Sequence, residues 1–375
     1  MPLEISKKVV CSIDPAAEDI EKLRCTINAY EDACNYLSLV CFQKKILDYR
    51  TLHNLAYRDI RAIFKLPAIL AVRAINRVIS SYKEQPHKHH IFRERSLPLD
   101  RRIFSLKRNK HFIASLTTPM GRAKVKLALG DRQKDVLSNP VSGARLVLRR
   151  RRLYIHIYVI CYVNQRGTEE PVGVDLGTRK LLMASNGFVI NGGQIRARRY
   201  HFNILKDSLR SKGTSSARKR LKQLSGREKR WSRTFLHQSS RALIESLNEG
   251  DYLVLERLYG TKTKLKGNRS SRSSHNGRNK QNCGSSTIIN LQHMISYKCE
   301  EMGIPVTLVR PDYTSQRCPR CGTIDKYNRR SQALFRCVSC GYQNNADFVA
   351  SINLRELALG GWAAVSQPDA VHSTL

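Results

Sequence analysis

The chain has 375 residues, and its 66 Lys and Arg residues against 30 Asp and Glu residues give a formal net charge of +36. Self-repulsion of this size does not help folding, and its usual reason is a polyanionic partner, most often nucleic acid. A hydrophobic content of 41% supplies real cores, so the composition excludes a disordered basic tail. The length allows two or three compact units.

The sequence also argues against a membrane partner. Its basic residues are spread along the chain rather than gathered on one amphipathic helix. Residues 1–8 contain no apolar signal core, and the longest apolar stretch, Leu153 to Val163, is interrupted by His156 and is too short to span a bilayer. We therefore expect a cytoplasmic, nucleoid-associated protein of prokaryotic type.

The first 90 residues predict a strand followed by a helical unit. Residues 3–13 alternate loosely and end at Asp14-Pro15, which is a helix-start signal. Residues 16–83 carry apolar side chains at helical spacing. The inward face of the last helix is expected to contain Ile69, Val72, Ile75, Val78 and Ile79. The polar segment 85–90 predicts a linker whose histidines are solvated rather than metal ligands.

Residues 91–165 change to short segments of strand character, punctuated by Gly, Pro and Asn, and predict a small antiparallel barrel or sheet. Four arginines, Arg149, Arg150, Arg151 and Arg152, fall at a turn between two of these strands. The run is either a solvated hairpin tip or a clamp for phosphate groups, and the charge of the chain favours the clamp.

From Pro171 the pattern predicts an α/β unit. Its strands are expected at residues 171–177, 181–185, 188–190, 251–256 and 305–309. The second and third of these form a hairpin around Asn186-Gly187. A further helix is expected over 288–302, the segment 260–286 is expected to be mobile, and residues 361–375 read as a loose tail.

Residues 196–235 predict a long basic helical region in the same unit. Together with the four-arginine run it supplies the candidate contacts to nucleic-acid backbone. These candidates in the helical region are Arg218, Lys219, Arg220, Lys222, Arg227, Lys229 and Arg230.

Four cysteines near the C-terminus form two pairs with the same spacing. Cys318 and Cys321 are followed after fifteen residues by Cys337 and Cys340, and a glycine follows the second cysteine of each pair. Two such turns make a tetrahedral cage of thiolates, which Zn²⁺ prefers, whereas a disulfide pair or four unrelated cysteines are the less favoured alternatives. One zinc ion with a structural role is expected, because four thiolates leave no position for water. The other seven cysteines are interpreted as small buried hydrophobes in a reducing compartment.

Three acidic residues lie at the ends of predicted secondary-structure elements. Asp175 and Glu256 each end a predicted strand, and Asp347 lies at the start of a helix. Each acid alone also has a structural interpretation: Asp175 could cap a turn, Glu256 could pair with a basic neighbour, and Asp347 could be a helix N-cap. Taken together, they are expected to converge, because the carboxyl ends of parallel strands share one edge of a sheet. Three carboxylates around a gap can hold two Mg²⁺ ions, which activate water and stabilise the leaving oxygen of a phosphodiester.

The order strand-acid, strand-acid, zinc module, helix-acid is the layout of an RNase H-like nuclease with a zinc insertion. The chain resembles the TnpB family of transposon-encoded RNA-guided nucleases, which is related to the compact type V CRISPR effectors. Gly173–Gly177 is similar to the first RuvC motif of that family, Leu253–Glu256 to the second, and Asn345–Asp347 to the third. Thr314–Gly322 is similar to the entry into its zinc ribbon.

The resemblance implies a multidomain α/β protein: an RNase H-like (RuvC) nuclease domain with an inserted Cys₄ zinc ribbon, plus an N-terminal wedge β-barrel with an inserted helical recognition lobe. It also implies a guide RNA, a target DNA and a short motif beside the target. The expected boundaries are 1–15 and 86–168 for the barrel, 16–85 for the lobe, 169–310 and 344–360 for the nuclease, 311–343 for the ribbon and 361–375 for the tail.

Two segments depart from the family pattern. Many relatives have an Asn two residues after the last acid and a pair of alanines beyond it, where this chain has Val349, Ala350 and Ser351. Relatives often carry another acid after the second motif, where this chain has Arg257-Leu258. The expected activity is RNA-guided DNA cleavage by a transposon-derived endonuclease. The alternatives are a type V CRISPR effector, a non-cleaving RNA-guided repressor and a DNA transposase, and the intact set of three acids argues against the repressor.

Overall fold

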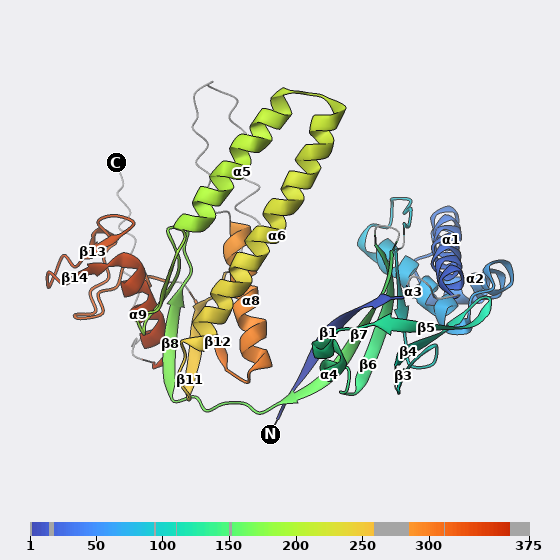
Figure 1. Ribbon diagram of the computed structural model, residues 1–375, viewed down its shortest axis with the longest axis horizontal. Helices are drawn as coiled ribbons and strands as arrows, with labels where there is room; N and C mark the ends of the chain where they lie inside the picture. Colours follow the sequence, from blue (N-terminus) through green and yellow to red (C-terminus); the bar gives the residue numbers. More distant parts are fainter. Residues whose placement is uncertain are drawn as a thin grey trace. The chain divides into compact units, whose positions relative to one another are not determined.

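The computed structural model describes residues 2–14, 19–93, 95–109, 111–149, 152–258, 285–310 and 312–360. It divides into two compact units, and each is described by itself (Figure 1). One spans Glu4–Tyr162, and the other contains the described residues from Val163 onward together with the N-terminal residues before Glu4. No helix in the described ranges is long and apolar enough to cross a bilayer.

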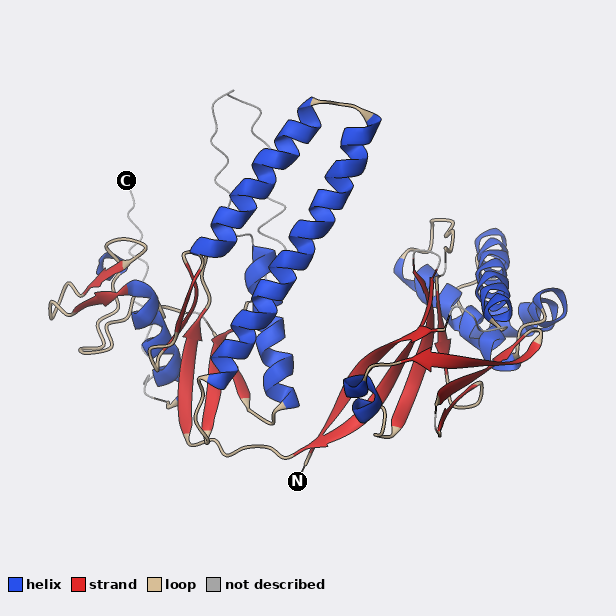
Figure 2. Cartoon of the chain, viewed as in Figure 1, coloured by secondary structure: helices blue, strands red, loops and turns tan. Residues whose placement is uncertain are grey.

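The first unit is built on a seven-stranded sheet with the order β2-β6-β7-β1-β5-β4-β3, seen as red arrows in Figure 2. The strands are β1 (Leu3–Ile13), β2 (Ser96–Leu99), β3 (Phe104–Arg108), β4 (Phe112–Thr118), β5 (Gly121–Ala128), β6 (Val141–Arg149) and β7 (Arg152–Val163). The predicted antiparallel sheet is confirmed, and it is a near-closed barrel. Strand β2 and the short helix α4 (Asp131–Val136) were not predicted.

Three helices are inserted between β1 and β2: α1 (Ile20–Lys44), α2 (Tyr49–Phe64) and α3 (Ala68–Glu84). The first two end at lysines in the left-handed conformation, Lys45 and Lys65, with φ of 51° and 50°. The Asp48 side chain caps α2 by accepting a hydrogen bond from the Thr51 amide at 2.9 Å. The helical unit predicted after the first strand is thus confirmed.

The expected inward face of α3 is partly wrong. Ile75, Val78 and Ile79 are buried, but Ile69 and Val72 keep partial exposure. Their places in the interior are taken by Leu70, Ala71 and Ala74. Helix α3 packs against both α1 and α2, so its buried stripe is wider than one helix face, and small alanine side chains allow close approach of the neighbours.

The second unit has a five-stranded sheet with the order β10-β9-β8-β11-β12. These strands are β8 (Glu170–Asp175), β9 (Lys180–Ala184), β10 (Val189–Asn191), β11 (Asp251–Glu256) and β12 (Val306–Val309). Strand β11 is parallel to both β8 and β12, whereas β9 is antiparallel to β8 and to β10. The predicted hairpin at Asn186-Gly187 is confirmed, and Gly187 supplies the positive φ of 90° that its turn requires.

Helices cover both faces of this sheet. They are α5 (Gly193–Ser211), α6 (Ser215–Glu245), α8 (Ser285–Glu301) and α9 (Ala346–Ala358). Leu236 and Leu243 of α6 and Ile295 of α8 belong to one buried cluster with Val172 and Val174 of β8. The basic region predicted over 196–235 is helical but divided, because Gly213 adopts a φ of 63° and the Thr214 side chain caps α6. The expected mobile segment lies outside the described residues except at its end, and the expected tail lies outside them entirely.

Candidate acidic site and cysteine cluster

Asp175 and Glu256 lie side by side at the carboxyl ends of two neighbouring parallel strands. Val174 of β8 is the register partner of Leu255 of β11, so the two acids are the next residues along each strand. Side chains alternate between the faces of a sheet, and both acids therefore project from the same face. The end of β11 is held by Gln292 of α8, whose side-chain amide donates to the Glu256 carbonyl oxygen at 2.7 Å.

Gly173 brings the third acid to this edge. A Cβ on Gly173 would lie 2.1 Å from the Ser351 carbonyl oxygen and 2.6 Å from the Arg355 amide nitrogen, so the backbone of α9 rests directly on β8. Gly173 and Asp175 share a face of β8 because they are two residues apart. Helix α9 therefore covers the face from which Asp175 projects.

Asp347 is in the first turn of α9 but does not cap it. The cap is Asn345, whose side-chain oxygen accepts from the amides of Asp347 at 3.1 Å and Phe348 at 3.3 Å. The alternative interpretation of Asp347 as an N-cap is therefore wrong. Its carboxylate instead meets the Arg329 guanidinium at 3.4 Å.

The charges of the three acids interact. Burial, reinforced by the negative charges of Asp347 and Glu256, raises the pKa of Asp175 to about 7. Burial also raises the pKa values of Glu256 and Asp347, and for Asp347 the positive charge of Arg329 opposes the shift. A site that raises the pKa of an aspartate in this way favours a bound proton or a cation.

Arg329 was missed in the sequence. It follows the short 3₁₀ helix η1 (Lys326–Asn328) between the two cysteine pairs, eighteen positions before the acid that it contacts. No spacing rule connects the two positions, because the contact depends on how the cysteine-containing segment folds back onto α9.

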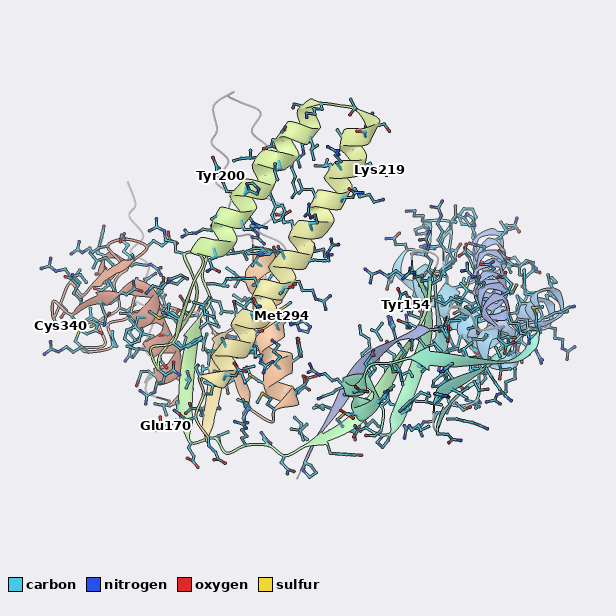
Figure 3. The ribbon with its side chains drawn as sticks, in the orientation of Figure 1. Tyr154, Glu170, Tyr200, Lys219, Met294 and Cys340 are labelled. Carbon is cyan, nitrogen blue, oxygen red and sulfur yellow. The ribbon has the colours of Figure 1, made fainter. Side chains whose placement is uncertain are left out.

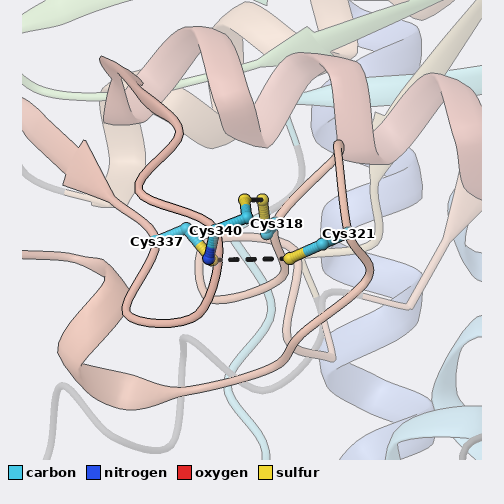
Figure 4. A group of neighbouring side chains, drawn as sticks. All are labelled: Cys318, Cys321, Cys337 and Cys340. Atoms are coloured by element: carbon cyan, nitrogen blue, oxygen red, sulfur yellow. Dashed lines mark hydrogen bonds between the residues drawn. The ribbon is translucent and has the colours of Figure 1, made fainter.

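The four cysteines are brought together as their spacing predicts (Figure 4). The sulfur atoms of Cys318 and Cys340 lie 3.7 Å apart, those of Cys321 and Cys337 lie 3.5 Å apart, and all four lie within 4.8 Å of one another. Tetrahedral Zn–S bonds of about 2.3 Å place sulfur atoms about 3.8 Å apart, so the group fits one zinc ion. In the described ranges it is the one cluster of His, Cys, Asp and Glu whose ligand atoms lie that close.

The two turns that carry the cysteines have the same construction. Gly322 and Gly341 have φ of 77° and 70°, a conformation that favours glycine. Their amides donate to the carbonyl oxygens of Cys318 at 2.9 Å and of Cys337 at 3.2 Å. Hydrogen bonding with Thr323 lowers the pKa of Cys321 to about 6, whereas burial raises that of Cys318 to about 12.

The cysteine cluster is continuous with the start of α9. Cys318 and Cys337 are buried in one apolar cluster with Phe335, Ala346 and Val349. The hairpin of β13 (Leu334–Arg336) and β14 (Gln343–Asn345) ends at the cap of that helix. The Asn353 side-chain amide of α9 also donates to the carbonyl oxygens of Thr314 at 2.7 Å and Arg317 at 2.8 Å. The fold around the thiolates therefore positions Asp347.

The candidate nucleic-acid contacts lie on exposed surfaces. Arg149 and Arg152 are register partners at the end of the β6–β7 hairpin, while Arg150 and Arg151 lie outside the described residues. The remaining candidates are all exposed on α6: Arg218, Lys219, Arg220, Lys222, Arg227, Lys229 and Arg230.

Comparisons with known proteins agree with this arrangement. The family model for the TNB domain of Cas12f1-like proteins matches residues 290–354, which include the four cysteines and Asp347. A CRISPR-associated endodeoxyribonuclease Cas12f1 of Syntrophomonas palmitatica is 32% identical over 216 residues, which are 52% of this chain but only 39% of that protein. The TnpB-like protein MJ0751 of Methanocaldococcus jannaschii is 27% identical over 64% of this chain and 89% of its own length.

A solved structure shows the same fold over most of the chain. The Cas12f1 chain of a cryo-EM complex with sgRNA and target DNA superposes with a TM-score of 0.61 at 14% identity, covering 90% of this chain and 83% of that one. The sequence and structural relatives thus point to one group of proteins. The chain is similar to a TnpB-like protein and, over part of their length, to compact type V CRISPR effectors.

Proposed function

We propose that this protein is an RNA-guided DNA endonuclease that cuts target DNA next to a short adjacent motif. The observation that carries the proposal is the grouping of Asp175, Glu256 and Asp347 at one sheet edge, where Asp175 is affected by the charges of the other two. The net charge of +36 supplies the electrostatic attraction for RNA and DNA. Named relatives include a CRISPR-associated endodeoxyribonuclease and a putative RNA-guided DNA endonuclease.

In this proposal the second unit is an RNase H-like (RuvC) nuclease domain with the cysteine segment as an inserted zinc ribbon. The first unit is a wedge barrel with helices α1, α2 and α3 as an inserted recognition lobe. The sheet orders and the chain positions of the insertions support this assignment.

The three carboxylates supply hard oxygen ligands for Mg²⁺. When bound there, two Mg²⁺ ions supply activation of a water molecule and stabilisation of the leaving oxygen of a phosphodiester. The chain holds the carboxylates partly out of water, and Arg329 balances the charge of Asp347. The cysteines would hold one Zn²⁺ with a structural role, since all four positions of the metal are then filled.

The exposed cations of α6, together with Arg149 and Arg152, would contact the phosphates of RNA and DNA. Such contacts carry little sequence information, so base pairing with the bound RNA would select the target.

A second candidate is a type V CRISPR effector, which the similarity to Cas12f1 favours. The two functions use the same chemistry and differ in where the RNA is encoded. A non-cleaving repressor is less favoured because the three acids are grouped. A transposase is less favoured because it must join DNA strands, and no catalytic Tyr or Ser arrangement stands out in the sequence.

Two experiments test the proposal. Sequencing the RNA that co-purifies with the protein identifies the guide and its genomic origin. Cleavage of a DNA library with and without this RNA, with Asp175→Ala as the control, then separates the candidates. Cleavage without RNA would leave a conventional nuclease, and joined DNA products would indicate a transposase.

A further inference from the structure

A pocket of about 390 Å³ lies between helices α5 and α6, within the second unit. Its apolar floor is formed by Phe202 and Leu205 of α5 and by Leu224 and Trp231 of α6. These residues are spaced three or seven apart on each helix, so each pair faces the other helix. Figure 3 shows the two helices side by side, with Tyr200 on α5 and Lys219 on α6 labelled.

Contacts beside the pocket hold its aromatic side chains in place. The Trp231 ring stacks on Phe235 at 5.5 Å with an interplanar angle of 16°. An ion pair joins Lys206 of α5 to Glu228 of α6 and fixes the spacing of the helices beside the pocket. The indole is only partly buried, so part of its surface remains accessible.

The rim of the pocket is cationic. Arg198, Arg227 and Arg230 line it, all three are exposed, and the lining residues include no acid. The Arg198 guanidinium lies over the Phe202 ring, 5.5 Å from its centroid. An aromatic floor surrounded by guanidinium groups complements a flat ring that carries phosphates.

We propose that this pocket binds one unpaired nucleotide of an RNA, with its base against Trp231 and its flanking phosphates on Arg227 and Arg230. The inference rests on the proposed function for the identity of the nucleic acid. A base inside a duplex is already stacked between its neighbours and does not present its face, so the pocket selects single-stranded or bulged RNA. The volume is within the range of sites for small ligands.

Tryptophan fluorescence gives a direct test. The chain contains two tryptophans, so Trp362→Phe leaves Trp231 as the one tryptophan. The full chain carrying that change, freed of nucleic acid, is titrated with an oligoadenylate RNA of about 12 nucleotides, with a DNA strand of the same sequence and with a blunt RNA duplex of equal phosphate count. The single strand is expected to quench Trp231 emission saturably, and the duplex is expected to bind without quenching.

Affinity measurements on variants complete the test. Trp231→Leu should weaken binding of the single strand about tenfold and leave duplex binding unchanged, with partial rescue by Trp231→Phe. The matched control is Tyr200→Leu, because Tyr200 is 64% exposed on α5 and does not line the pocket. Arg227→Ala should cost more affinity than Arg218→Ala, which removes an exposed charge outside the pocket.

Three outcomes would overturn the proposal: equal quenching by duplex and single strand, single-strand binding that leaves Trp231 emission unchanged, or preferential quenching by single-stranded DNA. These binding readouts do not depend on cleavage. If the single strand quenches Trp231 but the protein does not cut DNA, the pocket proposal stands and the nuclease function is wrong. If the protein cuts DNA but the single strand does not quench Trp231, only the pocket proposal is wrong.

Discussion

Asp175 is the residue at which fold stability and proposed chemistry conflict. An unfolded chain leaves its carboxyl near the ordinary pKa of 3.8, whereas burial and two neighbouring negative charges raise it to about 7 in the fold. Between these pH values the folded state binds the extra proton. The free energy of unfolding contributed by this group is therefore fully present below pH 3.8 and is lost as the pH rises through 7.

The first prediction uses Asp175→Asn. Without divalent cations the variant should gain stability over the natural chain as the pH rises from 5 to 8, because it carries no charge to bury. Mg²⁺ should raise the melting temperature of the natural chain more than that of the variant. DNA cleavage should fall roughly 10⁴-fold, as expected for one member of a cooperative site. Thermal unfolding with and without added Mg²⁺, in a buffer without a zinc chelator, measures the first two effects, and parallel pH profiles of the two proteins would contradict the first.

The second prediction concerns zinc. Elemental analysis should find one zinc ion per chain, and Cys337→Ser should lower both the zinc content and the melting temperature. Cleavage should fall as well, because the cysteine cluster packs on the residues that start α9. Cys25→Ser, at a partly exposed position outside the cluster, is the control and should keep its zinc. The absence of zinc from pure, folded protein would show that the four cysteines do not form a zinc site.

At the scale of the elements, the relation of β8 to α9 decides where Asp347 lies. Their contact depends on the missing side chain of Gly173, and the carbonyl oxygen of Ser351 occupies the position that a Cβ would need. Helix α9 must shift if that Cβ is added, since the nearest atoms belong to backbone. Asp347 would then move relative to Asp175.

The third prediction is that Gly173→Ala lowers cleavage about 100-fold, which is the cost of misplacing a reacting group by about 1 Å. Its Mg²⁺ requirement should rise, because the carboxylates no longer converge. Gly143→Ala is the matched control: Gly143 lies in a strand of the first unit and has nothing within 4 Å of its added Cβ. Cleavage assays across a series of Mg²⁺ concentrations measure both effects. An unchanged Mg²⁺ requirement for Gly173→Ala would show that this glycine does not position the acidic site.

These elements also show what the sequence can predict. The strands ending at Asp175 and Glu256 are short, buried and marked by acids, and the cysteine pairs have a regular spacing, so both patterns are local. Arg329 is different, because its contact with Asp347 depends on how the intervening segment folds. The buried face of α3 was similarly misjudged, since a helix between two neighbours buries more than its most apolar stripe.

The charge of +36 acts at the scale of the whole molecule. Phosphate contacts of many lysines and arginines release counterions, so binding of any nucleic acid should weaken steeply with salt. Counterion release makes binding tight without making it sequence-selective, since the phosphates are the same in every sequence. A chain of this charge that acts at one DNA site therefore needs another source of sequence information.

The last prediction identifies that source. When the guide segment of the co-purified RNA is replaced, double-strand cleavage should move to the DNA that matches the new guide, provided that the adjacent motif is present. Asp175→Ala should bind the same DNA with similar affinity but leave it uncut, because the proposed function assigns binding to phosphate contacts elsewhere and cleavage to the acidic site. Gel analysis of plasmid targets with matched and mismatched guides measures the effect. Cutting that ignores the guide swap, or site-specific cutting by RNA-free protein, would show that the chain itself reads the sequence, and the RNA-guided function would then be wrong.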